Sequence, residues 1–245
     1  MRKLRVLDLF SGIGGFSLGL ERTGGFETVA FCEIDPFCQR VLRKHWPHVP
    51  IYDDVRTLAG VECDLICGGF PCQDASVANV VGLGTDGDRT GLYTEPVRLA
   101  GELGCLLLME NVPGLLVRGF GDVLRAVAEI GFDAEWECIS AREAGADHER
   151  ERLWIMAYPG RERRQGFEHY HGLLGRARAA LPEYDDGAFG AWRSLVDGQY
   201  PLRSGDGLSV AMERRRLHGT GNAVVPQIPE IIGRAILQAG QLRGT

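Results

Sequence analysis

The sequence of 245 residues contains no apolar run close to the roughly 20 residues that a transmembrane helix needs, so we expect no membrane span. The apolar segment after the basic N-terminus is too short for a signal peptide, which predicts a cytoplasmic protein. None of the seven cysteines forms a Cys-x-x-Cys pair, so we expect reduced thiols and no metal site. The lysine and the serine or threonine of a phosphate-binding loop are also missing, which disfavours nucleoside triphosphate hydrolysis.

The formal net charge is -6, although proteins that bind nucleic acid usually present a basic surface. The charge is unevenly distributed, because residues 157–216 contain ten arginines against eight acidic residues. A basic segment on an acidic body favours contact with a polyanion through one lobe. A solvated surface without a partner is the alternative interpretation.

Short apolar runs alternate with helical patterns along most of the chain. This alternation predicts an α/β fold with a mostly parallel, doubly wound, Rossmann-like sheet, whose ligands bind beyond the carboxyl ends of the strands. The runs that we interpret as strands are Leu4–Leu9, Thr28–Cys32, Pro50–Tyr52, Asp64–Cys67 and Leu106–Met109.

The regular pattern stops after Tyr158 and returns near Gly219, ahead of an amphipathic helix that contains Ile228, Ile232 and Ile236. The length allows one core with a small appended lobe. We therefore predict a catalytic, cofactor-binding domain made of residues 1–158 and 218–245. Residues 159–217 would form a small inserted region.

The first predicted strand ends in a glycine-rich turn that contains Gly12 and Gly14, and Glu33 follows the second strand. A carboxylate at that position can accept hydrogen bonds from the ribose of an adenosine-containing cofactor. Asp53 and Asp54 could place a carboxylate near the adenine amino group. The alternatives are helix capping for Glu33 and a simple turn for the aspartate pair.

Cys72 and Glu110 each follow an apolar run, and Arg150 and Arg152 precede another. A thiolate that adds to C6 of cytosine makes C5 nucleophilic, and a carboxylic acid donating to N3 assists this addition. A guanidinium near O2, supplied by Arg152, would stabilise the developing charge. Taken singly, these residues could instead be a core thiol, a turn and a solvated charge run.

Five motifs in this order resemble those of the bacterial and phage DNA (cytosine-5) methyltransferases. They bracket residues 4–158 and 218–237, which make up most of the chain. The motifs are Asp8-Leu9-Phe10-Ser11-Gly12-Ile13-Gly14-Gly15, Gly69-Phe70-Pro71-Cys72-Gln73, Glu110-Asn111-Val112, Arg150-Glu151-Arg152 and Gly221-Asn222-Ala223-Val224.

The resemblance implies roles for residues at matching positions. Cys72 would be the nucleophile, Glu110 would hold N3 and the exocyclic amine, and Arg152 with Arg150 would support the base. S-adenosyl-L-methionine would contact Phe10, Gly12, Ile13, Gly14, Glu33, Ile34, Asp54, Val55, Phe70, Pro71, Asn222 and Val224. The DNA contacts would come from Gln73, Ser76, Arg161, Arg163, Arg164, Arg176 and Arg178.

The resemblance also implies double-stranded DNA as the partner and a cytosine flipped out of the duplex. A role in restriction and modification is expected, with a phage enzyme and a solitary regulator as the alternatives that the sequence leaves open. We expect a monomer in a bacterial cell, encoded by the bacterium or by a phage. Ala75 and Asn79 depart from the family pattern. Residues 159–217 would serve as the target recognition region, and the shortness of this region predicts a short or degenerate target sequence. The alternatives are tRNA cytosine-5 methylation, a catalytically degenerate DNA-binding regulator and, more distantly, an NAD-dependent oxidoreductase.

Overall fold

The computed structural model of the chain describes residues 2–71, 91–146, 148–160, 167–181 and 223–241. Within this part of the chain a seven-stranded sheet has the order β3-β2-β1-β4-β5-β7-β6. The strands are β1 (Leu4–Leu9), β2 (Phe26–Cys32), β3 (Ile51–Tyr52), β4 (Leu65–Gly69), β5 (Leu106–Asn111), β6 (Phe132–Ser140) and β7 (Glu151–Pro159). The α-helices are α1 (Gly15–Arg22), α2 (Pro36–His45), α3 (Thr94–Leu103), α4 (Phe120–Glu129), α5 (Leu173–Ala179) and α8 (Gln227–Gln241), and the 3₁₀ helices are η1 (Val55–Thr57), η3 (Pro113–Val117) and η4 (Glu168–Tyr170).

The first five strands pair in parallel, whereas β7 is antiparallel to both β5 and β6. The predicted α/β class with a mostly parallel sheet is confirmed. The antiparallel pairing of β6 with β7 was not predicted from the sequence. The strands predicted to end at Cys67 and Met109 each end two residues later, at Gly69 and Asn111, because their glycine or polar ends still pair across the sheet.

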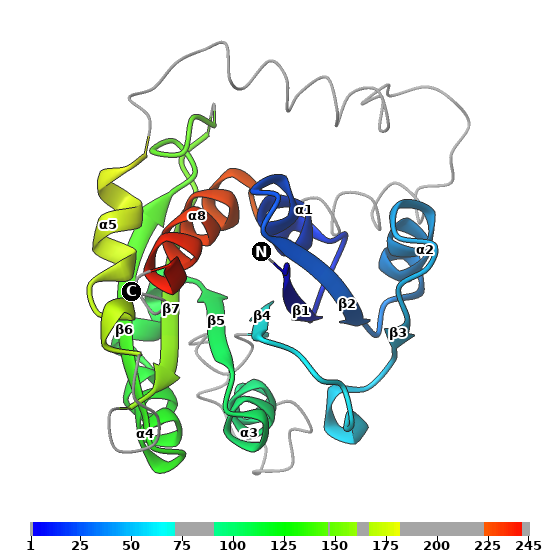
Figure 1. The fold of residues 1–245 in the computed structure, drawn as a ribbon, viewed down its shortest axis with the longest axis horizontal. Coiled ribbons are helices and arrows are strands. Elements are labelled where there is room, and N and C mark those ends of the chain that lie inside the picture. The colour runs from blue at the N-terminus through cyan, green and yellow to red at the C-terminus, as the bar shows by residue number, and fades with distance from the viewer. Residues whose placement is uncertain (1, 72–90, 147, 161–166, 182–222, 242–245) are drawn as a thin grey trace, which may run out of the picture.

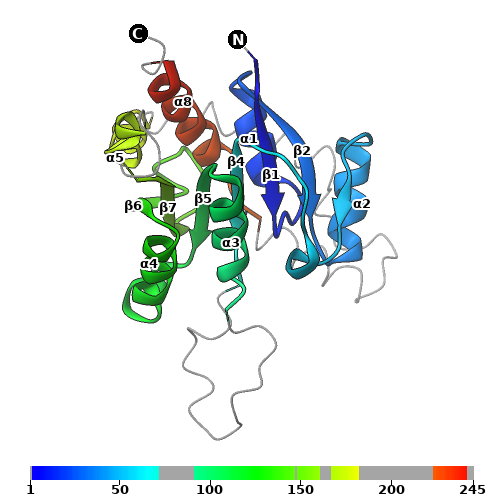
Figure 2. The same cartoon turned by 60° about the horizontal axis from the view of Figure 1, so that its bottom comes forward.

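Helices cover both faces of the sheet (Figures 1 and 2). Side chains from α1, α5 and α8 pack against one face, and side chains from α3 and α4 pack against the other. The central strands are therefore buried on both sides, and all six residues of β5 are buried. In α8, Ile228, Ile232 and Ile236 form the buried stripe that their spacing predicts.

Two local features explain where α2 begins. Pro36 occupies the first turn, where its missing N–H costs nothing, and the Asp35 carboxylate accepts from Phe37 N at 2.6 Å and from Cys38 N at 3.3 Å. This capping fixes the helix directly after the end of β2.

No helix in the described part of the chain has the length and apolar composition to cross a membrane.

Candidate active site

The turn after β1 meets the carboxylate that follows β2. Gly12 N donates to Glu33 Oε2 at 2.7 Å, and Asp35 N donates to Glu33 Oε1 at 2.7 Å. The turn needs a left-handed backbone at Phe10, Gly12 and Gly14, with φ values of 50°, 54° and 88°. Because each carboxylate oxygen can accept more than one hydrogen bond, Glu33 can still bind a ligand hydroxyl.

Gln39 connects the ends of β2 and β3, and sequence reasoning did not single it out. This buried amide on α2 donates from Nε2 to Glu33 O at 2.7 Å and to Asp53 Oδ1 at 2.6 Å. Of the two aspartates considered for the adenine amino group, Asp53 thus has one carboxylate oxygen bound by Gln39 of α2. Gln39 could have been identified from the sequence as a polar residue on the buried side of an amphipathic helix.

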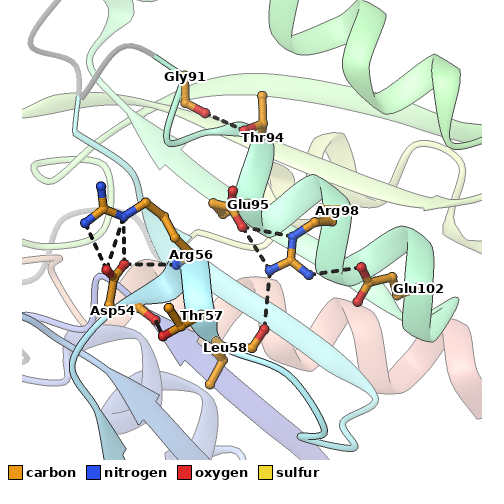
Figure 3. Close-up of polar contacts among 9 residues, drawn as sticks. All are labelled: Asp54, Arg56, Thr57, Leu58, Gly91, Thr94, Glu95, Arg98 and Glu102. Carbon is orange, nitrogen blue, oxygen red and sulfur yellow. Dashed lines mark hydrogen bonds and ion pairs between the residues drawn. The ribbon is translucent and has the colours of Figure 1, made fainter. Parts of the chain in front are cut away.

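Asp54 caps η1 and pairs with Arg56 (Figure 3). Its carboxylate accepts from Arg56 N at 3.0 Å, from Nε at 3.0 and 3.1 Å, and from NH2 at 2.9 Å. The hydrogen bond from the Arg56 side chain is the main cause that lowers the pKa of Asp54. Asp54 therefore remains an anionic acceptor at the same sheet edge as Glu33, because Cys32 lies opposite Tyr52 in the pairing of β2 with β3.

Arg98 of α3 connects this helix to the segment that follows Asp54 and η1 (Figure 3). Its NH2 donates to Leu58 O at 3.3 Å, while Nε and NH1 donate to Glu95 and Glu102, each at 2.9 Å. At the start of the same helix, Thr94 Oγ1 donates to Gly91 O at 2.6 Å. The backbone that enters α3 is thereby held against the segment that carries Asp54.

The other predicted cofactor residues divide into exposed and buried ones. Ile34 is 74% exposed at the end of β2, which makes its side chain available to a flat apolar ligand. Val55 and Phe70 are buried in the core beneath the edge, and Ile13 is half-buried. A Cβ atom on Gly15 would overlap the carbonyl of Val224, so the motif that precedes α8 contacts the start of α1.

Asp8 lies at the carboxyl end of β1, and sequence reasoning placed it in a motif without assigning it a role. Its Oδ2 accepts from Ser17 Oγ at 2.7 Å and from Ser17 N at 3.3 Å, whereas its buried Oδ1 has no hydrogen-bond partner among the residues that the structure describes. Burial raises the pKa of Asp8 to about 8, and the Ser17 hydrogen bonds oppose this shift. A protonated Asp8 thus connects β1 to α1.

Glu110 and Arg152 form an ion pair at the carboxyl edge of the sheet. Arg152 Nε lies 2.9 Å from Glu110 Oε1, and the two side chains are 23% and 11% exposed. Burial raises the pKa of Glu110, while the positive charges of Arg152 and Arg150 oppose the shift. A carboxyl group with a raised pKa beside a fixed cation suits proton donation to a bound base.

The direction of β7 explains this pairing. Because β7 runs antiparallel to β5, its first residues, and not its last, lie at the carboxyl edge, with Glu110 opposite Trp154. Arg152 therefore lies beside Glu110. Arg150 precedes the strand; burial lowers its pKa and the charge of Arg152 adds to this effect.

Gly69 makes room for the Glu110 carboxylate. The two residues are opposite each other in the pairing of β4 with β5, and a Cβ atom on Gly69 would lie 2.7 Å from Glu110 Oε2. The next residue, Phe70, accepts a hydrogen bond through its carbonyl from Asn111 Nδ2 at 3.0 Å. The strand end that precedes Pro71 and Cys72 thus lies directly beside the Glu110 strand.

Several predicted site residues lie outside the described residues. They are Cys72, Gln73, Ser76, Arg161, Arg163, Arg164 and Asn222, together with the two departures Ala75 and Asn79. Their predicted roles stay predictions. No group of three or more His, Cys, Asp or Glu side chains in the described ranges could hold a metal ion.

Two of the arginines predicted to contact DNA make contacts within the chain. Arg178 pairs with Glu137 and lies 2.9 Å from Glu143, and Arg176 donates to the carbonyls of His171 and His169 at 2.7 and 2.9 Å. Both belong to α5, whose apolar residues pack in the core formed with α8. The predicted division at residue 159 remains a prediction. Within the described part of the predicted insertion, Phe167, Tyr170 of η4 and the apolar residues of α5 join this core.

Comparison with known proteins identifies the family. A model described as C-5 cytosine-specific DNA methylase matches residues 4–175. The chain is 36% identical over 164 residues to the Type II methyltransferase M2.BsuMI of Bacillus subtilis, covering 63% of this chain and 42% of the relative. It is 33% identical over 183 residues to M.Sau3AI of Staphylococcus aureus, covering 64% and 44%. The chain therefore spans less than half the length of these two relatives.

Solved structures agree on the fold. The methyltransferase EhMeth of Entamoeba histolytica superposes with a TM-score of 0.63 at 12% identity, covering 97% of this chain and 99% of that one. The Dnmt2 methyltransferase of S. pombe superposes with a TM-score of 0.57 at 14% identity, covering 98% of both chains. Since the family model matches well over half of the chain, the chain belongs to the C-5 cytosine-specific DNA methylase family.

Proposed function

We propose that the protein transfers the methyl group of S-adenosyl-L-methionine to C5 of cytosine in double-stranded DNA. The observation that carries the proposal is the ion pair of the buried Glu110 with the partly exposed Arg152, beside the strand end that leads into Pro71-Cys72. Membership of the methylase family and the Type II methyltransferase relatives support it. Those relatives also support a role in restriction and modification.

The described residues fit the cofactor. Glu33 offers carboxylate oxygens for ribose hydroxyls, Asp54 offers an anionic acceptor for the adenine amino group, and the exposed Ile34 offers an apolar surface for the purine. Phe10, Gly12 and their neighbours complete this edge, and Asn222 and Val224 would close it from the C-terminal motif. When bound, the cofactor supplies an electrophilic methyl group.

The chain's own residues would perform the remaining steps. The Cys72 thiolate forms a bond to C6 while Glu110 gives its proton to N3, so that C5 becomes nucleophilic. Arg152 and Arg150 stabilise the charge that develops on the base. After methyl transfer, water accepts the C5 proton as the Cys72 thiolate leaves C6, and N3 returns its proton to the Glu110 carboxylate. These steps restore the aromatic ring and the starting protonation state of Glu110.

Duplex DNA must present the cytosine outside the stack, because neither a thiol nor a methyl donor reaches C6 and C5 within it. We assign Gln73, Ser76, Arg161, Arg163 and Arg164 to DNA contact as predictions from sequence. We also propose a monomer in the cytoplasm of a bacterial cell. The bacterial relatives support the bacterial source, whereas the monomer and the cytoplasm are predictions from sequence.

The test is methyl transfer by the purified protein. Labelled cofactor is incubated with unmethylated duplex DNA of varied sequence, and the digested nucleosides are analysed for 5-methylcytosine; a tRNA arm tests the alternative substrate. Cys72→Ser should abolish transfer, and Glu110→Gln should lower kcat by about 10²-fold, as expected for loss of one acid catalyst. Absence of 5-methylcytosine in every DNA pool would refute the proposal. A covalent complex with DNA containing 5-fluorocytosine would rule out a catalytically degenerate regulator.

A further inference from the structure

The hydrogen-bond pattern between β4 and β5 changes at the carboxyl ends of the two strands. Leu106 N donates to Asp64 O at 3.1 Å where the two strands begin to pair. In a parallel ladder the equivalent bond recurs two residues further along each strand. The bond due at the end of the ladder therefore runs from Val112 N to Phe70 O.

The side chain of Asn111 binds both the donor and the acceptor of this expected bond. Val112 N donates to Asn111 Oδ1 at 2.8 Å, and Asn111 Nδ2 donates to Phe70 O at 3.0 Å. An amide and two hydrogen bonds now span what one hydrogen bond would span, so the strand ends are held further apart than a continuous ladder would hold them. Asn111 is 3% exposed, and both halves of its amide are used in a setting where unpaired groups are costly.

The separation occurs where a planar base has to enter. Glu110 precedes Asn111 on one strand, and Cys72 follows Phe70 by two residues on the other. Since Pro71 has no N–H, the Phe70 carbonyl is the only hydrogen-bonding group of the peptide that leads into Pro71. Asn111 thus binds the one group of this peptide through which a hydrogen bond can orient the backbone ahead of Cys72.

The Phe70 ring is held independently of its carbonyl. It is buried and lies 6.2 Å, centroid to centroid, from the ring of Tyr93, which precedes α3. With the ring packed and the carbonyl bound, little freedom remains in the direction of the backbone at Phe70. The amide of Asn111 is the part of this arrangement that requires one residue type, since aspartate lacks the donor and serine lacks the reach.

We infer that Asn111 is a positioning residue, whose side-chain amide separates the ends of β4 and β5 and sets the distance between the cysteine-bearing strand end and the Glu110 carboxyl for a pyrimidine ring. This role rests on the proposed cytosine methylation. Displacement of reacting groups by about 1 Å costs on the order of 10²-fold in rate, so the amide acts on turnover more than on ligand binding.

The experiment compares Asn111→Asp and Asn111→Ser with the wild type. An ionised aspartate keeps the acceptor for Val112 N and has no donor for Phe70 O, and the shorter serine, whose hydroxyl does not reach Phe70 O, adds no charge. For both we expect the rate of covalent adduct formation with 5-fluorocytosine DNA and kcat to fall by about 10- to 100-fold, while the Kd for S-adenosyl-L-methionine changes by less than about threefold. Val127→Ala, a buried change in α4, is the control for general loss of stability, and it should lower Tm with kcat retained.

Retention of kcat in both Asn111 variants would overturn the inference. It would also be overturned if the Asn111 variants lost no more kcat than the Val127→Ala control, compared at equal Tm. If the variants do not fold, the wild type still decides the matter. The Asn111 side-chain amide should exchange slowly with deuterium by NMR, and fast exchange would contradict its bond to Phe70. A wild type that methylates no DNA would refute the proposed function, whereas an active wild type with fully active Asn111 variants would refute the positioning role alone.

Discussion

Replacing Asp8 with asparagine should stabilise the protein at neutral pH and remove part of the pH dependence of its stability. The side chain is fully buried, and burial raises the pKa of its carboxyl to about 8. An asparagine keeps an oxygen for the two hydrogen bonds from Ser17. Its amide nitrogen replaces an oxygen that has no partner in the described part of the chain, and a protonated aspartic acid carries a hydrogen in the same surroundings.

The magnitude follows from the two pKa values of Asp8. In an unfolded chain an aspartate has a pKa of about 3.9, so from there up to the folded pKa only the folded state holds the proton. Over that range the free energy of unfolding falls by about 1.4 kcal/mol per pH unit, which amounts to about 4 kcal/mol at about pH 7. The stabilising contribution is complete below the unfolded pKa and is lost as the pH rises toward about 8.

The assay is urea denaturation followed by tryptophan fluorescence, since the chain has four tryptophans. Between about pH 5 and about pH 7 the wild type should lose about 3 kcal/mol more than Asp8→Asn does. Asp64→Asn is the control: although burial opposes it, the hydrogen bonds from Arg2 and Arg5 lower the pKa of Asp64, so this variant should be less stable at both pH values by a similar amount. Equal pH dependence in the wild type and in Asp8→Asn would refute the reasoning.

Three further predictions concern the catalytic edge and α5. Arg152→Gln removes a charge that opposes the raised pKa of Glu110, so the alkaline limb of the kcat–pH profile should move to higher pH while kcat falls; an unmoved limb would show that the pair does not control the acid. Gly69→Ala places a methyl group against the Glu110 carboxylate, and we expect kcat to fall by about 10-fold or more while Tm changes little; a variant with normal kcat would contradict this steric reasoning. Arg178→Ala breaks two partly exposed ion pairs, so the free energy of unfolding should fall by less than about 1 kcal/mol in urea titrations. The DNA affinity of this variant should stay unchanged, and a salt dependence reduced by about one phosphate contact would instead support the predicted DNA role.

The parallel part of the fold could be predicted because its signals are local. Each strand from β1 to β5 is a mainly apolar run. The strands β4 and β5 end in Gly69 and Asn111, and a polar residue follows within two positions of the ends of β1, β2 and β3. Parallel strands end at one edge. This rule placed Glu33, Asp54 and Glu110 at one edge before any pairing was known. The antiparallel pair of β6 and β7 escaped prediction, since nothing in either segment specifies its partner.

Sequence order and residue type were enough to establish the family, the α/β class, and the chemistry that Cys72, Glu110 and Arg152 could perform. The tertiary structure decided which charges meet: Arg152 reaches Glu110 because β7 runs antiparallel to β5, and Arg178 is bound within the chain. It also decided that Asn111 replaces the last hydrogen bond between β4 and β5. These contacts join residues about forty positions apart, and such pairings depend on strand direction and register, which no local pattern of residues encodes.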